Sequence, residues 1–181
     1  MLQITVPAHG ELWDEANEMF IQTKEQTLRL EHSLVSVSKW ESRWRKPFLD
    51  GKPKTRDETL DYIRCMTITQ NVDPKAYLSL TDKNYREIND YIDDKHTATT
   101  FRKEPNPKRS REIVTSELIY YWMLQYGIPF ECQTWHLNRL LTLIRICNVK
   151  SEPPKKRSKS EIARSYAAEN AARKKLWNTT G

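Results

Sequence analysis

Glycine is scarce in this 181-residue chain, and the four that occur, Gly10, Gly51, Gly127 and Gly181, are more than 40 residues apart. Folds rich in β-hairpins need frequent turn residues with positive φ, and glycine is the usual choice there. Loops that cradle phosphate with backbone N–H groups need closely spaced glycines. The scarcity therefore favours helices and excludes nucleotide hydrolysis through a glycine-rich loop.

Cysteines and long apolar runs are also few. Cys65, Cys132 and Cys147 are odd in number and far apart, so they do not form a disulfide framework, and we expect reduced thiols in a cytoplasm. No basic and then apolar leader opens the chain, and its apolar runs fall far short of the ~20 residues that span a bilayer. We expect a soluble protein without membrane contact.

The excess of positive over negative charge lies at one end of the chain. From Lys150 onward nine Lys or Arg residues accompany three acidic ones, so the net charge of +6 lies entirely in this part. The segment "SEPPKKRSKS" reads as a linker, and Ser158 with Glu161 has the spacing of a capping box in front of a C-terminal helix. We therefore expect a helical domain at 1–149 and a basic linker with a helix at 150–181.

The basic arm is defined by the cations of this extension. They are Lys155, Lys156, Arg157, Lys159, Arg164, Arg173, Lys174 and Lys175. Such arms can neutralise nucleic-acid phosphates, but here three carboxylates and a long alanine stretch dilute the charge. We favour a solvated tail or a helix docked on an acidic surface, and keep nucleic acid as an alternative partner.

The apolar pattern of residues 1–149 predicts a mainly α-helical, compact domain. "LQITVP" alternates apolar and polar residues and predicts a short N-terminal strand. Residues 11–46 show mostly helical spacing, and Thr55 with Glu58 forms a capping box before the next helix. A short helix after Pro74 and a further helix from Thr81 follow.

Two more helices are expected in the second half of this domain. One runs from Ser110 to a left-handed glycine cap at Gly127, and Pro129 prevents its continuation. Thr134 is expected to cap the next helix, whose leucines recur at three and four residues. Between them and the preceding helix, 93–110 lacks a period and predicts a long loop or a short strand pair near 97–101.

The dense stretch "YYWMLQYGIPFECQTWHLNRLLTLIRICN" at 120–148 raises the question of a metal or catalytic centre. Cys132 and His136 form one pair of candidate ligands, but Cys147 lies eleven residues beyond His136, which is ~16 Å along a helix. No oxyanion or hydrolase motif accompanies Cys132. A helical hairpin with Trp122 and Trp135 in its core is the favoured interpretation. We expect no cofactor, no metal and no enzymatic activity.

Several stretches together resemble one family of proteins. "LEHSLVSVSKWE", "DYIRCMTITQNVDP", "SELIYYWM" and "IPFECQTWHLNRLLTLIRICN" look like small proteins of the structural-gene modules of tailed bacteriophages and prophages. The order of residues from Glu117 to Ile144 is similar to tail assembly chaperones. That resemblance implies binding to the tape-measure protein before the tail tube polymerises around it, in the cytoplasm of the host bacterium.

The expected function is therefore a non-enzymatic phage tail assembly chaperone. Aromatics and leucines beside a turn can form a groove for an amphipathic helix, and the candidate contact residues are Trp122, Tyr126, Trp135, Leu140 and Ile144. Partners are the tape-measure protein or other tail and head proteins, with homo-oligomerisation as a further option. The alternative is a virion protein, a connector or capsid-associated subunit, whose basic arm contacts a neighbouring subunit or DNA.

Overall fold

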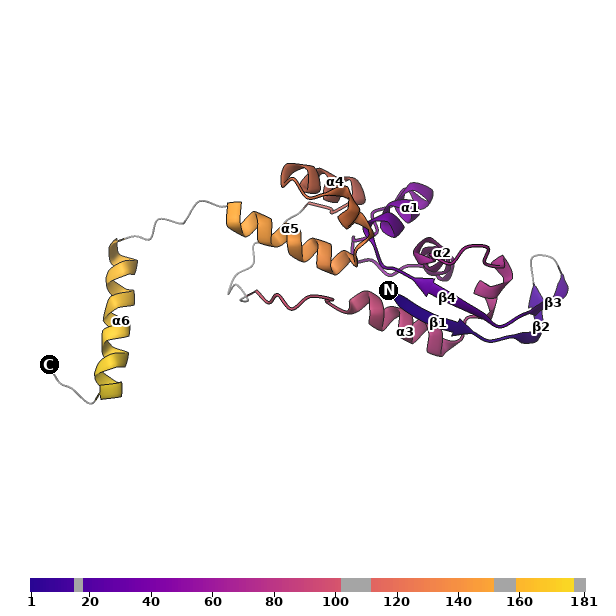
Figure 1. The fold of residues 1–181 in the computed structure, drawn as a ribbon, viewed down its shortest axis with the longest axis horizontal. Helices are drawn as coiled ribbons and strands as arrows, with labels where there is room; N and C mark the ends of the chain where they lie inside the picture. The colour runs from indigo at the N-terminus through magenta and orange to yellow at the C-terminus, as the bar shows by residue number, and fades with distance from the viewer. Residues whose placement is uncertain (15–17, 102–111, 152–158, 178–181) are drawn as a thin grey trace. The chain divides into compact units, whose positions relative to one another are not determined.

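The computed structural model describes residues 1–14, 18–101, 112–151 and 159–177. Contacts group the chain into two units, Met1–Cys147 and Asn148–Gly181. The mainly helical class is confirmed, and so is the N-terminal strand (Figure 1). The elements in chain order are β1 (Leu2–Val6), β2 (His9–Asp14), β3 (Met19–Thr23), β4 (Gln26–Leu30), α1 (Leu34–Trp44), α2 (Arg56–Met66), the 3₁₀ helix η1 (Pro74–Ser79), α3 (Asp82–Asp93), α4 (Ser116–Gln125), the 3₁₀ helix η2 (Phe130–Thr134), α5 (Leu137–Ser151) and α6 (Lys159–Trp177).

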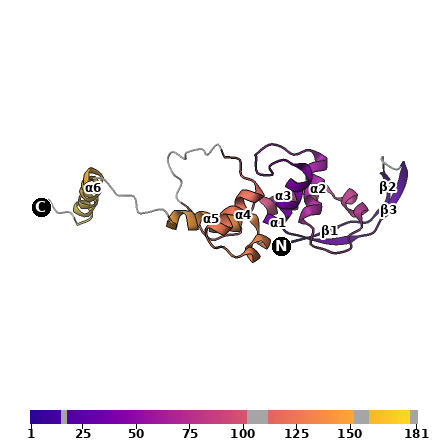
Figure 2. The ribbon, with the colours of Figure 1, turned by 90° about the horizontal axis from the view of Figure 1, so that it is seen from above.

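The strands form an antiparallel ribbon in two parts. β1 pairs with β4, from Leu2 opposite Leu30 to Val6 opposite Gln26, and β2 pairs with β3 further along (Figure 2). Pro7 separates β1 from β2 because proline has no N–H to donate to a ladder. Alternate residues of β1 and β4 point into the core, where they are fully buried.

The prediction of helix over 11–46 is wrong for 11–14 and 18–33, which form strands and their connections, and its part at 15–17 lies outside the described residues. Gln26 to Leu30 alternates exposed and buried side chains at a period of two, and β1 supplies the partner for its backbone. On β3, the Thr23 hydroxyl is hydrogen-bonded to the Ser79 hydroxyl of η1 at 2.7 Å. Helix begins only after Ser33, whose side chain accepts from Ser36 N in a capping box. Pairing with a distant strand has overridden the apparent helical spacing.

The capping box predicted for Thr55 and Glu58 is confirmed. Thr55 and Glu58 exchange the two hydrogen bonds of a capping box at the start of α2, at 3.2 Å and 2.8 Å. The helix predicted from Thr81 is α3, which begins at Asp82 with Thr81 as its N-cap, and the short helix after Pro74 is a 3₁₀ helix. The loop predicted after α3 is confirmed where the structure describes it, up to Phe101, and no strand pair forms in that part.

Two predicted helix starts are wrong. α4 begins at Ser116 rather than Ser110, with Thr115 as its N-cap, and the residues between Glu112 and Thr115 are not helical. Thr134 does not cap α5, because it ends η2, and α5 begins at Leu137. Leu137 N instead donates to the carbonyl oxygen of His32 at 2.7 Å, so the segment between β4 and α1 fixes the start of α5.

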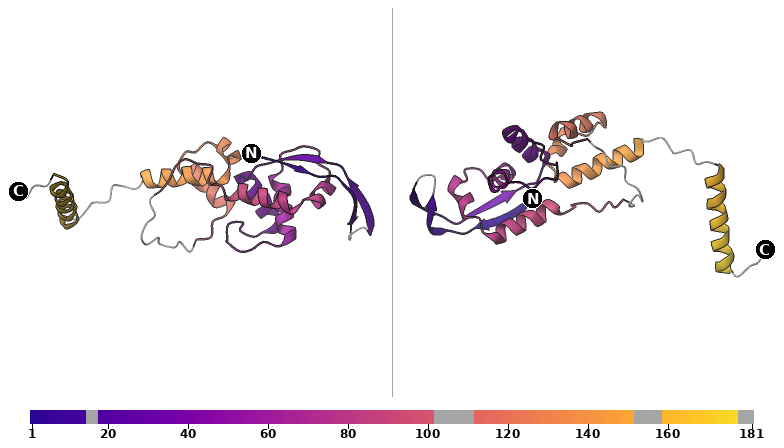
Figure 3. Two further views of the ribbon diagram at one scale, coloured as in Figure 1. Left: turned by 90° about the horizontal axis from the view of Figure 1, so that it is seen from below. Right: turned by 180° about the vertical axis from the view of Figure 1, so that it is seen from behind.

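One continuous core fills the first unit. α1 packs on α2 and α4, and α3 packs on β1 (Figure 3). Trp40 is buried at its centre, where its indole N–H donates to Glu58 O at 2.8 Å. Among the described residues, every buried side-chain nitrogen or oxygen has a hydrogen-bond partner, as a well-ordered interior requires.

The second unit carries the predicted C-terminal helix. α6 runs from Lys159 to Trp177, and its described side chains are almost all exposed. Its expected capping residue, Ser158, lies outside the described residues. No described helix is both long and apolar enough to cross a membrane.

Candidate partner-binding surface

Helix α4 is apolar on nearly all of its sides. Ile119 and Met123 point inward and are fully buried, while Tyr121 and Leu124 point outward with 57% and 63% of their surface exposed. A surface helix ordinarily carries polar residues on its outer side. The outer side of α4 therefore offers large apolar side chains that the first unit does not itself cover.

The turn after α4 has the geometry that the sequence predicts. Gly127 has φ of +62°, and its N–H donates to Leu124 O at 3.2 Å. Ile128 N donates to Met123 O at 2.8 Å, which completes a Schellman motif, and both of these side chains are buried. This fixed turn brings η2 back beside the helix.

Phe130, at the start of η2, extends the exposed surface of α4. Its side chain is 50% exposed, and its ring centroid lies 6.2 Å from that of Tyr120. The Tyr120 hydroxyl donates to Gln133 Oε1 at 2.8 Å, which holds the ring in place. Tyr120, Tyr121 and Leu124 are neighbours at helical spacing. We call Tyr120, Tyr121, Leu124 and Phe130 the aromatic surface.

Glu41 of α1 fixes the start of α4. Its carboxylate accepts hydrogen bonds from Ser116 N at 2.8 Å and from Phe48 N at 2.7 Å. Ser116 is the first residue of α4, where the unpaired amides and the positive end of the helix dipole favour a carboxylate. One buried side chain thus ties α1, the segment after it and the helix that carries the aromatic surface.

The predicted contact residues divide into two groups. Leu140 and Ile144 are 0% and 7% exposed, so they belong to the core and the prediction that they touch a partner is wrong for them. The other three, Trp122, Tyr126 and Trp135, are partly buried against the core. Their burial follows from the same three and four spacing that suggested a groove, because that spacing marks the inward side of a helix.

The side chain of Arg139 covers one face of the Trp135 ring. The Arg139 guanidinium lies over its ring at 4.1 Å, a cation–π contact within the chain. Tyr121, Leu124 and Phe130 are not among the contact residues predicted from the sequence. The stretch "SELIYYWMLQ" does indicate exposed apolar side chains on this helix. A helix that is apolar on all sides leaves some of them exposed unless other elements enclose it fully.

His136 belongs to a cluster of three histidines that no pattern in the sequence predicts. The His136 ring lies 5.1 Å from the His32 ring and 4.1 Å from the His96 ring, centroid to centroid. These residues come from the end of the ribbon, the segment after α3 and the start of α5. His32 Nδ1 shares a hydrogen bond with the Tyr62 hydroxyl. The cluster joins three segments that are distant in sequence.

The hydrogen bonds of His136 identify its neutral form. Asn138 N donates to His136 Nδ1 at 3.3 Å, so this nitrogen carries no proton. Nε2 then carries the proton and donates to Tyr91 O at 3.0 Å. Burial lowers the pKa of His136, and burial together with the charges of His136 and His96 lowers the pKa of His32 from 6.5 to about 3. Both rings are neutral at pH 7.

The histidine cluster holds distant segments of the chain together. No three His, Cys, Asp or Glu side chains in these parts are grouped to hold a metal ion. Cys132 is buried in η2, as expected of a small apolar core residue, and burial raises the pKa of the Cys65 thiol in α2. The arrangement pins the start of α5 to α1 and α3.

The basic arm is divided by what the structure describes. Lys155, Lys156 and Arg157 lie outside the described residues. The other cations lie on α6, where Arg164 and the three consecutive residues Arg173, Lys174 and Lys175 are exposed. Lys159 is the first residue of that helix.

Comparison with protein-family models, with curated proteins and with solved structures finds no match.

Proposed function

We propose that this protein is a non-enzymatic assembly factor that binds an apolar helix of a partner protein through the aromatic surface. The partner that we propose is the tape-measure protein of a tailed phage, which is what the resemblance of the sequence to tail assembly chaperones implies. Binding takes place in the host cytoplasm, before the tail tube polymerises. The uncovered outer side of α4 is the observation that carries the proposal.

The physical reason lies in what an apolar helix does when it is alone. A long protein with many amphipathic helices aggregates unless their apolar sides are covered. A rigid surface of aromatic side chains and a leucine covers such a helix at low entropic cost, because aromatic side chains have few rotatable bonds. Tyr121 and Leu124 present that chemistry one helical turn apart.

Exposure of these side chains makes a clean test. We expect Tyr121→Ser combined with Leu124→Ser to weaken binding to tape-measure fragments by about 100-fold or more, since each lost apolar contact is worth about 1.5 to 3 kcal/mol and each 1.4 kcal/mol is about tenfold in affinity. Folding should be little affected, because surface substitutions usually change stability by only about 0.5 kcal/mol. The measurement is the amount of soluble fragment that co-purifies after co-expression.

Matched controls are present in the same chain. Leu78 in η1 and Tyr166 in α6 are also exposed, and Leu78→Ser with Tyr166→Ser removes the same two kinds of side chain elsewhere. This control should bind like the unaltered protein. Equal binding by both double variants, or no binding of fragments by the unaltered protein, would overturn the proposal.

The virion alternative has its own readout. Quantitative mass spectrometry of purified particles should find the protein absent, while it is abundant in the lysate of infected cells. A fixed copy number in particles would instead favour a structural subunit, for which the exposed cations of α6 are the natural contact with a neighbour or with DNA.

A further inference from the structure

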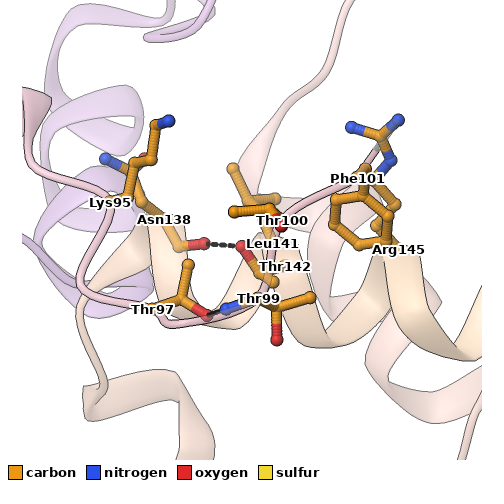
Figure 4. Close-up of a pocket in the computed structure, with 9 residues that line it drawn as sticks. All are labelled: Lys95, Thr97, Thr99, Thr100, Phe101, Asn138, Leu141, Thr142 and Arg145. Atoms are coloured by element: carbon orange, nitrogen blue, oxygen red, sulfur yellow. Dashed lines mark hydrogen bonds between the residues drawn. The ribbon is translucent and has the colours of Figure 1, made fainter. Parts of the chain in front are cut away.

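A pocket of about 360 Å³ lies between α5 and the segment 95–101 that follows α3 (Figure 4). Lys95 and Arg145 stand at its two ends, and neither forms an ion pair with any residue that the structure describes. Four threonines and an asparagine supply the polar part of its lining, and no carboxylate is among the lining residues that the structure describes. The pocket is positive and rich in hydroxyl groups.

The wall formed by α5 is held firmly. Asn138 donates both side-chain hydrogens, to Ile92 O at 2.9 Å and to Asp94 O at 2.8 Å. Thr142 donates its hydroxyl hydrogen to Asn138 O at 2.8 Å. Because the amide of Asn138 fastens the end of α3 to α5, the segment that begins at Lys95 leaves from a fixed point.

The opposite wall keeps hydroxyl donors available. Thr97 Oγ1 accepts from Thr99 N at 3.1 Å, which bends the segment and leaves the Thr97 hydroxyl hydrogen free to donate. Thr99 and Thr100 also line the pocket, and each carries a hydroxyl group. Three hydroxyl donors on one short segment suit a ligand that has several acceptor oxygens.

Arg145 is oriented by its neighbour. Its guanidinium lies over the Phe101 ring at 4.1 Å, so the plane of the group is set by stacking while its N–H edges remain available. A planar fork of this kind matches two oxygens of a phosphate group. The acidic residue nearest in sequence, Asp94, is engaged by His96 Nε2 at 3.3 Å.

We propose that this pocket binds a phosphate group, with Arg145 and Lys95 supplying charge and Thr97, Thr99 and Thr100 supplying hydrogen bonds. The site is separate from the aromatic surface and does not depend on the function proposed for it. The phosphate comes either from a small phosphorylated molecule or from a nucleic-acid backbone, and both present the same oxygens to these donors.

The test uses inorganic phosphate and a short single-stranded DNA oligonucleotide as probes, with the full chain, at constant ionic strength set by chloride. Titration followed by amide NMR should give saturable shifts at Thr97, Thr99 and Phe101. Arg145→Gln and Lys95→Gln should each weaken binding at least tenfold, and Arg145→Lys should fall between Arg145→Gln and the unaltered protein because it keeps charge without the fork. Thr99→Val removes a donor at nearly constant shape and should also weaken binding.

Lys83→Gln is the matched control. Lys83 is an exposed lysine on the neighbouring helix α3, and its substitution removes the same charge as Lys95→Gln. It should leave binding unchanged. Saturation by phosphate without competition from the oligonucleotide assigns the site to small phosphorylated ligands, and tighter binding of the oligonucleotide assigns it to nucleic acid. Shifts that do not saturate, or that persist undiminished in Arg145→Gln, would overturn the proposal.

Discussion

Lowering the pH from 7 to 5 is expected to reduce the free energy of unfolding by about 2 kcal/mol through His32 alone. The pKa of His32 falls from 6.5 to about 3 in the folded protein, chiefly because the ring is buried. Below pH 6.5 the unfolded chain therefore binds a proton at His32, whereas the His32 ring of the folded protein stays neutral until the pH approaches 3. Stability is lost as the pH falls from 6.5 toward 3, and His136, whose pKa is also lowered, acts in the same direction.

The groups around His32 set this behaviour. His136 and His96 repel a proton on its ring, and Tyr62 meets it with a phenol whose pKa is itself raised by burial. The carboxylates of Glu31 and Asp94 raise the pKa of His136, but less than burial lowers it. Burial is the largest cause in both rings, and it outweighs the groups that favour protonation.

Urea unfolding at pH 7 and pH 5 measures the effect, and a His32→Asn variant isolates it. Asparagine keeps a polar neighbour for the Tyr62 hydroxyl but does not titrate in this range. The variant should lose about 2 kcal/mol less than the unaltered protein between the two pH values. An identical loss in both proteins would show that His32 is not responsible.

Glu41→Ala is expected to cost about 3 kcal/mol of stability. The change removes the acceptor for Ser116 N and Phe48 N together, and a donor left unsatisfied in the interior costs about 1 to 3 kcal/mol. Glu41→Gln keeps one acceptor oxygen and should cost roughly half as much. Chemical denaturation gives both values.

The same variant should loosen the helix that carries the aromatic surface. Amides of α4 should exchange with deuterium faster in Glu41→Ala, because its first turn loses the contact with α1. Amides of α2, which receive neither of the two hydrogen bonds of the Glu41 carboxylate, serve as the internal control. A stability change under 0.5 kcal/mol with unaltered exchange in α4 would contradict this role for Glu41.

Local signals in the sequence predict much of this fold. Thr55 with Glu58, Thr81 and Gly127 each mark a helix end through interactions within a few residues, so their roles are legible without the rest of the chain. The strands within 9–30 cannot be predicted from such short-range interactions. Their conformation depends on pairing, such as Leu28 opposite Ile4, and a spacing that suits either helix or strand cannot report it.

The candidate surface was located only in part, for a related physical reason. Leu140 and Tyr121 are both large and apolar, and which of them is buried depends on the neighbours that fold against each helix. The regular leucines of α5 mark the core side, while the exposed side chains of α4 belong to a helix with no clear polar side. The histidine cluster was missed because residues 32, 96 and 136 meet only in the folded chain.

The central claim is that the aromatic surface contacts an apolar helix of the tape-measure protein. Site-specific photocrosslinking tests it most directly, with a photoreactive phenylalanine analogue placed at position 121 or, as the control, at the equally exposed position 166 of α6. In cells that also make the tape-measure protein, we expect a crosslink to that protein from position 121 and none from position 166. Crosslinking from position 166 alone, or from neither, would contradict the claim.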